Sequence, residues 1–346
     1  MKTEHYPPLV ELTLARLREF VREPEALFWA FIFPIIMSVA LAVAFPGQEA
    51  RPALVGVADG PGAEALRAAL AGHEDIVLRE VPSGTELGAI RDGDVQVIVV
   101  PGTPPTYRFD PERAESRVAR LMVDNALKQA AGRAEPWVAR EDPVAVPGSR
   151  YIDWLIPGLL GMNIMSTGMW GIGFAIVQAR LRKLLKRLAA SPMRRADYLL
   201  AQMLARLVFL APEAIVPLAF GAMVLGMPVR GSVTAITVVC VWGAVTFTGL
   251  GLLAGSRPRT LEAISGVLNL AMVPMWVVSG VFFSASNFPP AVQPVIQALP
   301  LTALNDALRA VVLEGAALRQ VASELAIMAA WAVSSFILAL KLFRWR

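Results

Sequence analysis

The chain has few of the residues that soluble proteins use for charged surfaces, metal sites or covalent cross-links. Only 17% of its 346 residues are charged, against about a quarter in an ordinary soluble domain. Cysteine occurs once, at Cys240, which argues against a disulfide framework and a thiol metal centre. The two histidines, His5 and His73, stand apart from each other in the sequence, so we expect no metal site.

Patterns for nucleotide binding and catalysis are also missing. No phosphate-binding G-x-x-x-x-G-K-S/T occurs, and none of the five lysines follows a glycine. Neither H-E-x-x-H nor G-x-S-x-G is present. Gly60-Pro-Gly62-Ala-Glu-Ala65, with Glu80 about twenty residues on, resembles a dinucleotide fingerprint. Because Asp59 would lie beside the pyrophosphate, we interpret this stretch as a glycine-rich turn into a helix. We therefore expect no catalytic residue and no cofactor.

Long apolar runs are what the sequence does have. Its hydrophobic fraction is 55% and its mean hydropathy is +0.54. About 20 apolar residues in a helix cross the hydrocarbon core of a membrane. Six such runs cover 26–45, 152–178, 198–226, 232–255, 262–283 and 320–340. The chain is therefore predicted to be a mainly α-helical membrane protein with six transmembrane helices.

The distribution of basic residues predicts how these helices are oriented. Sixteen Lys and Arg lie in the short segments on the side of the termini, and three lie in the short segments opposite. The positive-inside rule then places both termini in the cytoplasm, in the inner membrane of the cell. This bias also explains the net charge of +4 without nucleic acid as a partner. Cleavage after Ala42-Val-Ala44 is an alternative, although about 20 apolar residues is long for a signal peptide.

The chain divides into segments of different character. An amphipathic helix in the membrane plane is expected over 1–24, and the first transmembrane helix over 25–45. Residues 46–150 carry twelve Lys or Arg and sixteen Asp or Glu, and alternate predicted strands with predicted helices. The strands are 53–58, 76–80 and 95–100, and the helices 62–71, 84–91 and 111–130. This pattern predicts a small extracytoplasmic α/β domain. Residues 151–346 hold transmembrane helices 2–6, a cytoplasmic loop at 180–197 and an outer-leaflet helical hairpin at 287–314.

Two sets of residues are candidates for function. The stretch from Arg180 to Arg195 carries seven basic residues, and its leucines at 181, 184, 185 and 188 share one helical face. Ser191-Pro192 then predicts the start of a second helix. The other set consists of polar residues inside predicted spans, namely Asn163, Arg206, Glu213 and Asn269. Arg206 and Glu213, two turns apart, could form a structural pair, a polar contact between subunits or part of a substrate pathway.

Three motifs, in this order, give the chain its resemblance to a known family. They are Leu14-Ala-Arg-Leu-Arg-Glu-Phe-Val-Arg-Glu-Pro24 before Phe33-Pro34-Ile-Ile-Met37, the loop Arg180–Tyr198 with Leu188-Ala-Ala-Ser191-Pro192, and Leu299-Pro-Leu-Thr-Ala-Leu-Asn-Asp-Ala-Leu-Arg309. Over nearly its whole length the chain resembles the permease subunits of type-two ABC transporters, in the exporter branch with a large loop between the first two spans. It departs from the pattern at Leu181-Arg-Lys-Leu184, where the family usually has an acidic, glycine-bearing start.

The resemblance implies a permease that pairs with a second permease, as a homodimer or heterodimer, above cytoplasmic ABC ATPase subunits. ATP hydrolysis would take place on that partner. It also implies that the loop couples the two proteins, through Arg182, Lys183, Leu184, Leu185, Lys186, Arg187 and Leu188. The apolar spans favour a hydrophobic or amphipathic cargo, such as a drug or lipid-like molecule. Two alternatives stay open: a secondary transporter that uses Glu213 as its ion site, and a membrane-anchored sensor or scaffold.

Overall fold

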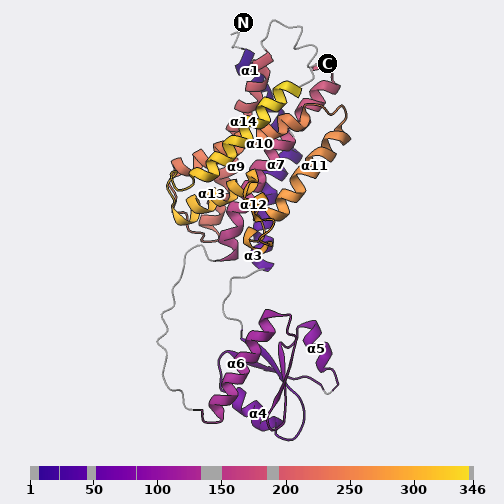
Figure 1. The fold of residues 1–346 in the computed structure, drawn as a ribbon, viewed down its shortest axis with the longest axis vertical. Coiled ribbons are helices and arrows are strands. Elements are labelled where there is room, and N and C mark those ends of the chain that lie inside the picture. The colour runs from indigo at the N-terminus through magenta and orange to yellow at the C-terminus, as the bar shows by residue number, and fades with distance from the viewer. Residues whose placement is uncertain are drawn as a thin grey trace. The chain divides into compact units, whose positions relative to one another are not determined.

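A computed structural model describes residues 8–22, 24–44, 52–82, 84–133, 150–184 and 195–342. The chain forms two compact units, which are considered separately. One unit is Gln48–Val144, and the other combines Met1–Gly47 with Ala145–Arg346. The second unit is a bundle of long helices, and the first contains the β-sheet (Figure 1).

Among the residues that the structure describes, five helices of the bundle are long and apolar enough to cross a membrane. They are α7 (Tyr151–Leu181), α9 (Arg195–Met223), α10 (Val233–Gly255), α11 (Leu261–Val278) and α14 (Ala322–Leu342). A rise of about 1.5 Å per residue makes a helix of about 20 residues as long as the hydrocarbon core is thick. The predicted runs from 152 onward therefore correspond to these five helices.

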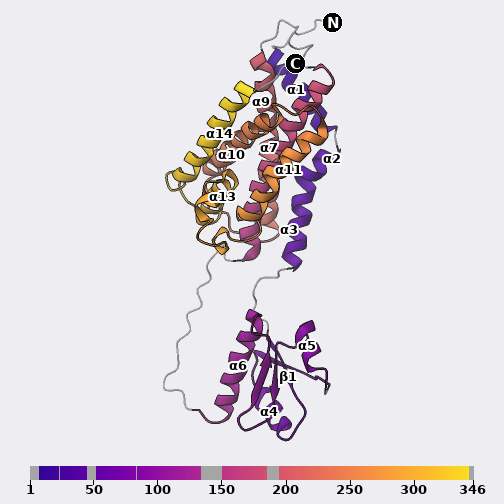
Figure 2. The same ribbon diagram turned by 45° about the vertical axis from the view of Figure 1, so that its right-hand side comes forward.

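The N-terminal part of this unit is helical but irregular. Its elements are α1 (Pro8–Val21), α2 (Pro24–Leu27), the π-helix η1 (Phe28–Ile32) and α3 (Phe33–Ala44). The apolar helix Phe28–Ala44 is shorter than the five others. α1 packs against α9, and α3 packs against α7 (Figure 2). The predicted first span thus forms a helix, and its crossing of the membrane stays a prediction.

Glycines allow α7 and α10 to pack closely. A Cβ atom on Gly251 would lie 2.8 Å from the carbonyl oxygen of Gly168, and one on Gly255 would lie 3.1 Å from the carbonyl oxygen of Gly173. Side chains at these positions would force the two helices apart. Gly171 is not part of the contact, because a Cβ there would meet no atom within 4 Å.

Between α11 and α14 the chain forms η2 (Ala285–Asn287), α12 (Gln293–Gln297) and α13 (Pro300–Glu314). Pro300 is at the first position of α13, where it has no amide hydrogen to leave unpaired. Gly315 ends the helix in a left-handed conformation, with φ of 74°. α13 packs against α7, α10 and α14. Helices therefore form over the predicted hairpin, while its depth in the outer leaflet stays a prediction.

The smaller unit is a four-stranded sheet with three helices. The strands are β1 (Ala53–Val57), β2 (Ile76–Arg79), β3 (Val97–Val100) and β4 (Thr106–Phe109), in the order β2-β1-β3-β4. β1 pairs in parallel with β2 and β3, and β4 is antiparallel to β3. The helices are α4 (Ala63–Leu70), α5 (Glu86–Asp92) and α6 (Ala114–Ala130). The predicted strands and helices all form, and β4 is a strand that the prediction missed.

The glycine-rich stretch after β1 is a turn into a helix. Gly62 precedes α4 with φ of 92°, a conformation that favours glycine. Asp59, which would face a pyrophosphate, forms an ion pair of 2.9 Å with Arg67 of the same helix. The arrangement agrees with the turn into a helix that was predicted.

Candidate functional site

A buried ion pair lies in the middle of the helical bundle. Arg206 and Glu213, both on α9, are 7% and 1% exposed. An Nη1 hydrogen of Arg206 is donated to Oε2 of Glu213. Residues seven apart lie on the same face of a helix after two turns. The structure therefore forms the pair that the sequence spacing suggested.

Helix α7 completes the surroundings of this pair. The hydroxyl of Thr167 donates to Oε1 of Glu213 at 2.6 Å, so both carboxylate oxygens have a partner. Nη2 of Arg206 donates to the carbonyl of Ile164 at 3.3 Å. Thr167 was not predicted, although it lies one turn after Asn163 and faces the same side of the helix. The signal was present in the sequence as a second polar residue at i+4.

Asn163 joins this cluster to the N-terminal helices. Its side-chain amide donates to the carbonyl of Ala30 at 2.8 Å. Ala30 belongs to the π-helix η1, which has an irregular hydrogen-bond pattern. One cluster therefore connects η1, α7 and α9. Asn269 does not take part in it, because it is exposed on α11. Three of the four predicted pathway residues therefore lie together, and the fourth, Asn269, lies elsewhere.

A second buried polar cluster surrounds Arg309 of α13. Its guanidinium carbon lies 3.5 Å from the ring centroid of Trp154, and its Nε donates to the carbonyl of Trp154 at 3.3 Å. Nη2 also donates to the carbonyl of Gly280. Nearby, the amide of Asn305 donates to the carbonyl of Ser279 at 2.9 Å. This cluster connects the start of α7, the end of α11 and α13. The sequence identified the motif but not its buried arginine.

The predicted coupling segment is described only at its start. Arg182, Lys183 and Leu184 are exposed, whereas Leu185, Lys186, Arg187 and Leu188 lie outside the described residues. α7 continues through Leu181, and Lys183 then has φ of 56°. The predicted helical face shared by the leucines at 181, 184, 185 and 188 is therefore wrong at its beginning. The left-handed residue breaks the helix, so Leu181 and Leu184 are not on one continuous helical face.

Arg180, the first residue of the basic stretch, is engaged in a contact between two helices. Its guanidinium donates to the carbonyls of Gly255, Ser256 and Pro258, at the end of α10 and in the connection that follows. Four carbonyls at the C-terminal end of any α-helix lack partners within the helix. Arg180 satisfies such groups from the neighbouring helix, and it belongs to α7 rather than to a separate basic helix.

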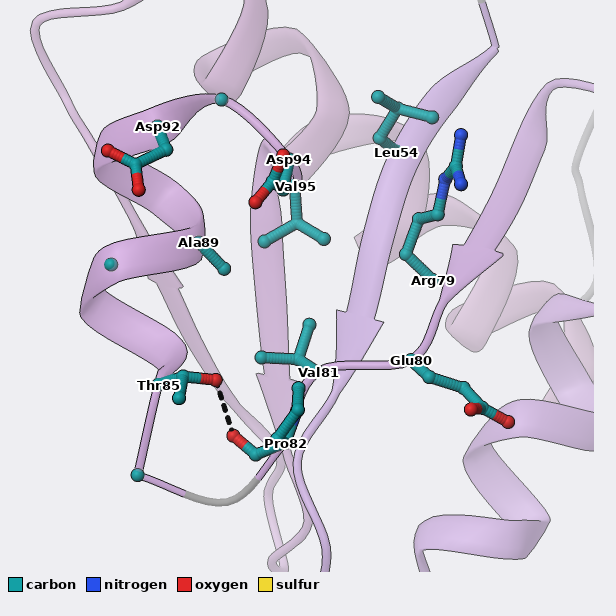
Figure 3. A pocket seen from close by; sticks show the side chains of 13 residues that line it. Leu54, Arg79, Glu80, Val81, Pro82, Thr85, Ala89, Asp92, Asp94 and Val95 are labelled. Carbon is teal, nitrogen blue, oxygen red and sulfur yellow. Dashed lines mark hydrogen bonds between the residues drawn. The ribbon is translucent and has the colours of Figure 1, made fainter.

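The α/β unit contains a hollow of about 760 Å³ beside α5 (Figure 3). Leu54, Val81, Ala89 and Val95 give it apolar walls, and Arg79, Glu80, Asp92 and Asp94 supply charged groups. The sequence gave no sign of this hollow.

The helical unit and its buried polar clusters define a polytopic membrane protein, which carries a small α/β unit. A family model described as ABC-2 family transporter protein matches residues 24–341. The chain therefore belongs to this family, and it is an ABC transporter permease. No curated protein matches the chain. Membership means a membrane component for transport, with an ATPase partner and an oligomeric arrangement in general.

Proposed function

We propose that this chain is the permease subunit of an ATP-driven exporter that moves a hydrophobic or amphipathic compound out of the cell. The residues from Arg182 to Leu188 are the contact with the cytoplasmic ABC ATPase. Hydrolysis occurs on that separate chain. Both termini are cytoplasmic, residues 46–150 are extracytoplasmic, and a second permease completes the pathway as a homodimer or heterodimer.

The observation that carries this proposal is the break at the end of α7. A helix of 31 residues ends at Leu181, and Lys183 follows in a left-handed conformation, with φ of 56°. A long buried helix transmits a displacement along its axis because its hydrogen bonds resist compression. The exposed turn at its end is where a partner can apply that displacement. Its three described side chains, two basic and one leucine, are exposed.

The net charge of the cargo is inferred from the buried ion pair of the bundle. Arg206 and Glu213 neutralise each other, and Thr167 occupies the remaining carboxylate oxygen. A charged substrate would need an unpaired opposite charge within the membrane to offset its lost hydration. The pair offers none, which favours a cargo with little net charge. Membrane lipid surrounding the apolar helices would be the source from which such a cargo enters.

The coupling role is tested by replacing Leu184 and Leu185 with Asp. The two carboxylates would oppose an apolar contact, so we expect loss of ATPase association and of ATP-dependent efflux. Leu87→Asp is the matched control, because Leu87 is 73% exposed on α5 of the α/β unit. Efflux from proteoliposomes and co-purification of the ATPase are the two measurements. Wild-type transport by the double variant would refute the coupling role.

An ion-gradient transporter using Glu213 is the rival. A proton site must bind and release its proton during the cycle, whereas both oxygens of Glu213 are engaged by Arg206 and Thr167. This favours a structural role for the carboxylate. If Glu213→Gln stopped transport while ATP and the bound ATPase were present and hydrolysis continued, the rival would be preferred.

A further inference from the structure

Helix α6 of the α/β unit has one face against the sheet and the opposite face in solvent. Ala119, Val123 and Ala126 are buried, and the helix packs on α4, β1, β3 and β4 (Figure 2). On the opposite face, Val118 and Leu121 are 51% and 56% exposed. A surface helix normally carries polar residues on the face that points away from the core. Two large apolar side chains one turn apart on this face are therefore unusual for a helix that meets only water.

The exposed residues of α6 follow the seam of a two-stranded coiled coil. Five exposed residues, spaced by four, three, four and three positions, form what we call the α6 seam: Ala114, Val118, Leu121, Asn125 and Lys128. This spacing alternates between positions a and d of a heptad, with Val118 and Asn125 at a and Leu121 at d. A β-branched residue at a with Leu at d favours two parallel strands, and a polar Asn at a sets their register. The pattern therefore fits a second helix with the same seam.

The charged residues beside the seam are tied to the α/β unit itself. The guanidinium carbon of Arg120 lies 5.6 Å from the ring centroid of Phe109. The carboxylate of Asp124 accepts hydrogen bonds from the hydroxyl of Tyr107 at 3.2 Å and from Lys128 at 2.6 Å. Lys128 thus has an opposite charge within its own helix, which reduces the repulsion between two copies of this residue at the end of the seam.

We propose that the α6 seam pairs with the same seam of a second copy of this chain, as a parallel two-stranded coil about a two-fold axis. This pairing rests on the proposed function, since it requires the second permease to be an identical chain. Closed two-fold dimers present the same surface from both subunits, as a seam that pairs with itself does. In the pair, each Val118 and Leu121 is covered by its counterpart, and the two Asn125 amides form a hydrogen bond across the axis.

The helical unit makes so short a coil sufficient. α6 has 17 residues, which is between two and three heptads, and helices of this length are only marginally stable alone in water. The chain enters the α/β unit after α3 and leaves it before α7, so both ends of this unit continue into the helical unit. Two paired helical units therefore hold two α/β units at an effective concentration on the order of millimolar. At that concentration a weak contact is enough to pair the seams.

Disulfide cross-linking tests the pairing. Cys240 is the only cysteine and is buried, so in a Cys240→Ala background each new cysteine reports its own position. The sample is the full-length chain in lipid nanodiscs, oxidised with copper phenanthroline. In a parallel pair each seam residue meets its own counterpart, so Leu121→Cys and Asn125→Cys should both cross-link. Leu87→Cys, 73% exposed on α5, is the matched control and should cross-link at least about tenfold more slowly, because its counterpart is out of reach.

The same two positions decide the direction of pairing. In an antiparallel pair centred on Leu121, the two copies of that residue would still meet, whereas the two Asn125 residues would lie about 12 Å apart along the helices. Cross-linking at Leu121→Cys alone would therefore overturn the parallel pair. Cross-linking at neither position, with maleimide labelling both cysteines as fast as Leu87→Cys, would overturn the contact altogether.

A charge placed in the seam should separate the copies. In Leu121→Glu with Asn125→Cys, two like charges would face each other at the centre of the pair, so cross-linking should fall by about tenfold or more. Glu is a good helix former and Leu121 is exposed, so α6 should still form, and circular dichroism checks this. Leu87→Glu with Asn125→Cys is the control and should cross-link as before. Undiminished cross-linking in the Leu121→Glu variant would contradict the pairing.

The number of chains in each nanodisc separates this pairing from the proposed function. Photobleaching of one fluorophore per chain counts them. If active discs hold a single chain, the second permease is absent, and both the pathway dimer and the seam contact are refuted. If active discs hold two identical chains that do not cross-link at Leu121→Cys, only the seam contact is refuted. If transport requires a second permease of different sequence, pairing between identical chains is refuted while the proposed exporter stands.

Discussion

Removing one member of the Arg206–Glu213 pair should cost more stability than removing both. The two side chains are 7% and 1% exposed, and their only other described partners are Thr167 and the carbonyl of Ile164. Arg206→Met would leave the Glu213 carboxylate buried without a counter-charge. Breaking a buried pair from one side typically costs about 3–5 kcal/mol. We expect a loss of that size in the free energy of unfolding for Arg206→Met, and a similar loss for Glu213→Met.

The double variant should behave differently. With both charges replaced by thioether side chains, no group is left to desolvate except the hydroxyl of Thr167, which can still donate to the carbonyl of Asn163 at 2.8 Å. Exchanging a buried ion pair for apolar residues is often neutral or better. We therefore expect a loss of less than about 2 kcal/mol, and a coupling energy of about 4 kcal/mol or more between the two positions.

The assay is reversible unfolding of the detergent-solubilised chain, followed by tryptophan fluorescence. Ser166→Ala is the control, because the hydroxyl of Ser166 donates to the carbonyl of Met162 within its own helix at 2.8 Å. Its effect should be within about 0.5 kcal/mol. If the loss in the double variant equals the sum of the two single losses, the charges do not interact and the reasoning is refuted.

Three further predictions follow from other contacts. Gly251→Ala should cost about 1–3 kcal/mol by overpacking, because its Cβ would lie 2.8 Å from the carbonyl oxygen of Gly168. Gly171→Ala, whose Cβ would meet no atom within 4 Å, should be neutral or stabilising. Equal effects of the two variants on the free energy of unfolding would contradict the α7–α10 contact. Arg309→Lys keeps the charge but loses the stacked plane over Trp154, and should cost about 2 kcal/mol. Asp306→Asn removes a half-exposed carboxylate that lies 3.7 Å from Arg309, and should cost less than about 1 kcal/mol by the same measurement. A hydrogen bond from Lys128 lowers the pKa of Asp124, with a smaller contribution from the hydroxyl of Tyr107. The ionised Asp124 therefore stabilises the α/β unit above a pH of about 4, and this stabilisation is lost on acidification. Asp124→Asn should flatten the acid limb of the stability curve, and an unchanged limb would refute the assignment.

Much of the fold could be predicted because it depends on local patterns. Strands 53–58, 76–80 and 95–100 were visible as short apolar runs between helical segments, and β1, β2 and β3 form there. β4 was missed because only Tyr107 and Phe109 of its four residues face the core, and prolines precede it closely. The position of β4 in the sheet is decided by its pairing with β3, and the local sequence pattern does not indicate this pairing.

The candidate sites were only partly predictable. The spacing of Arg206 and Glu213 along one helix was enough to suggest their pair, because helical geometry alone brings i and i+7 together. Thr167 reaches Glu213 from another helix, 46 residues away. Arg180 was counted with the basic stretch 180–195 because its charge matched that of its neighbours. Its side chain instead faces a helix end, where a guanidinium can satisfy unpaired carbonyls.

By itself, the sequence determined that the chain enters a membrane, roughly which segments form its long helices, and that an α/β unit interrupts them. Those properties follow from the length of apolar runs, the placement of basic residues and the local chemistry of glycine and proline. Only the tertiary structure decided which polar groups meet. Arg309 donates a hydrogen bond to the carbonyl of Trp154, 155 residues away in the sequence, and Arg180 donates one to the carbonyl of Gly255, 75 residues away. Such contacts depend on how glycine-lined helices cross, and a buried polar group is stable only where the crossing supplies its partner.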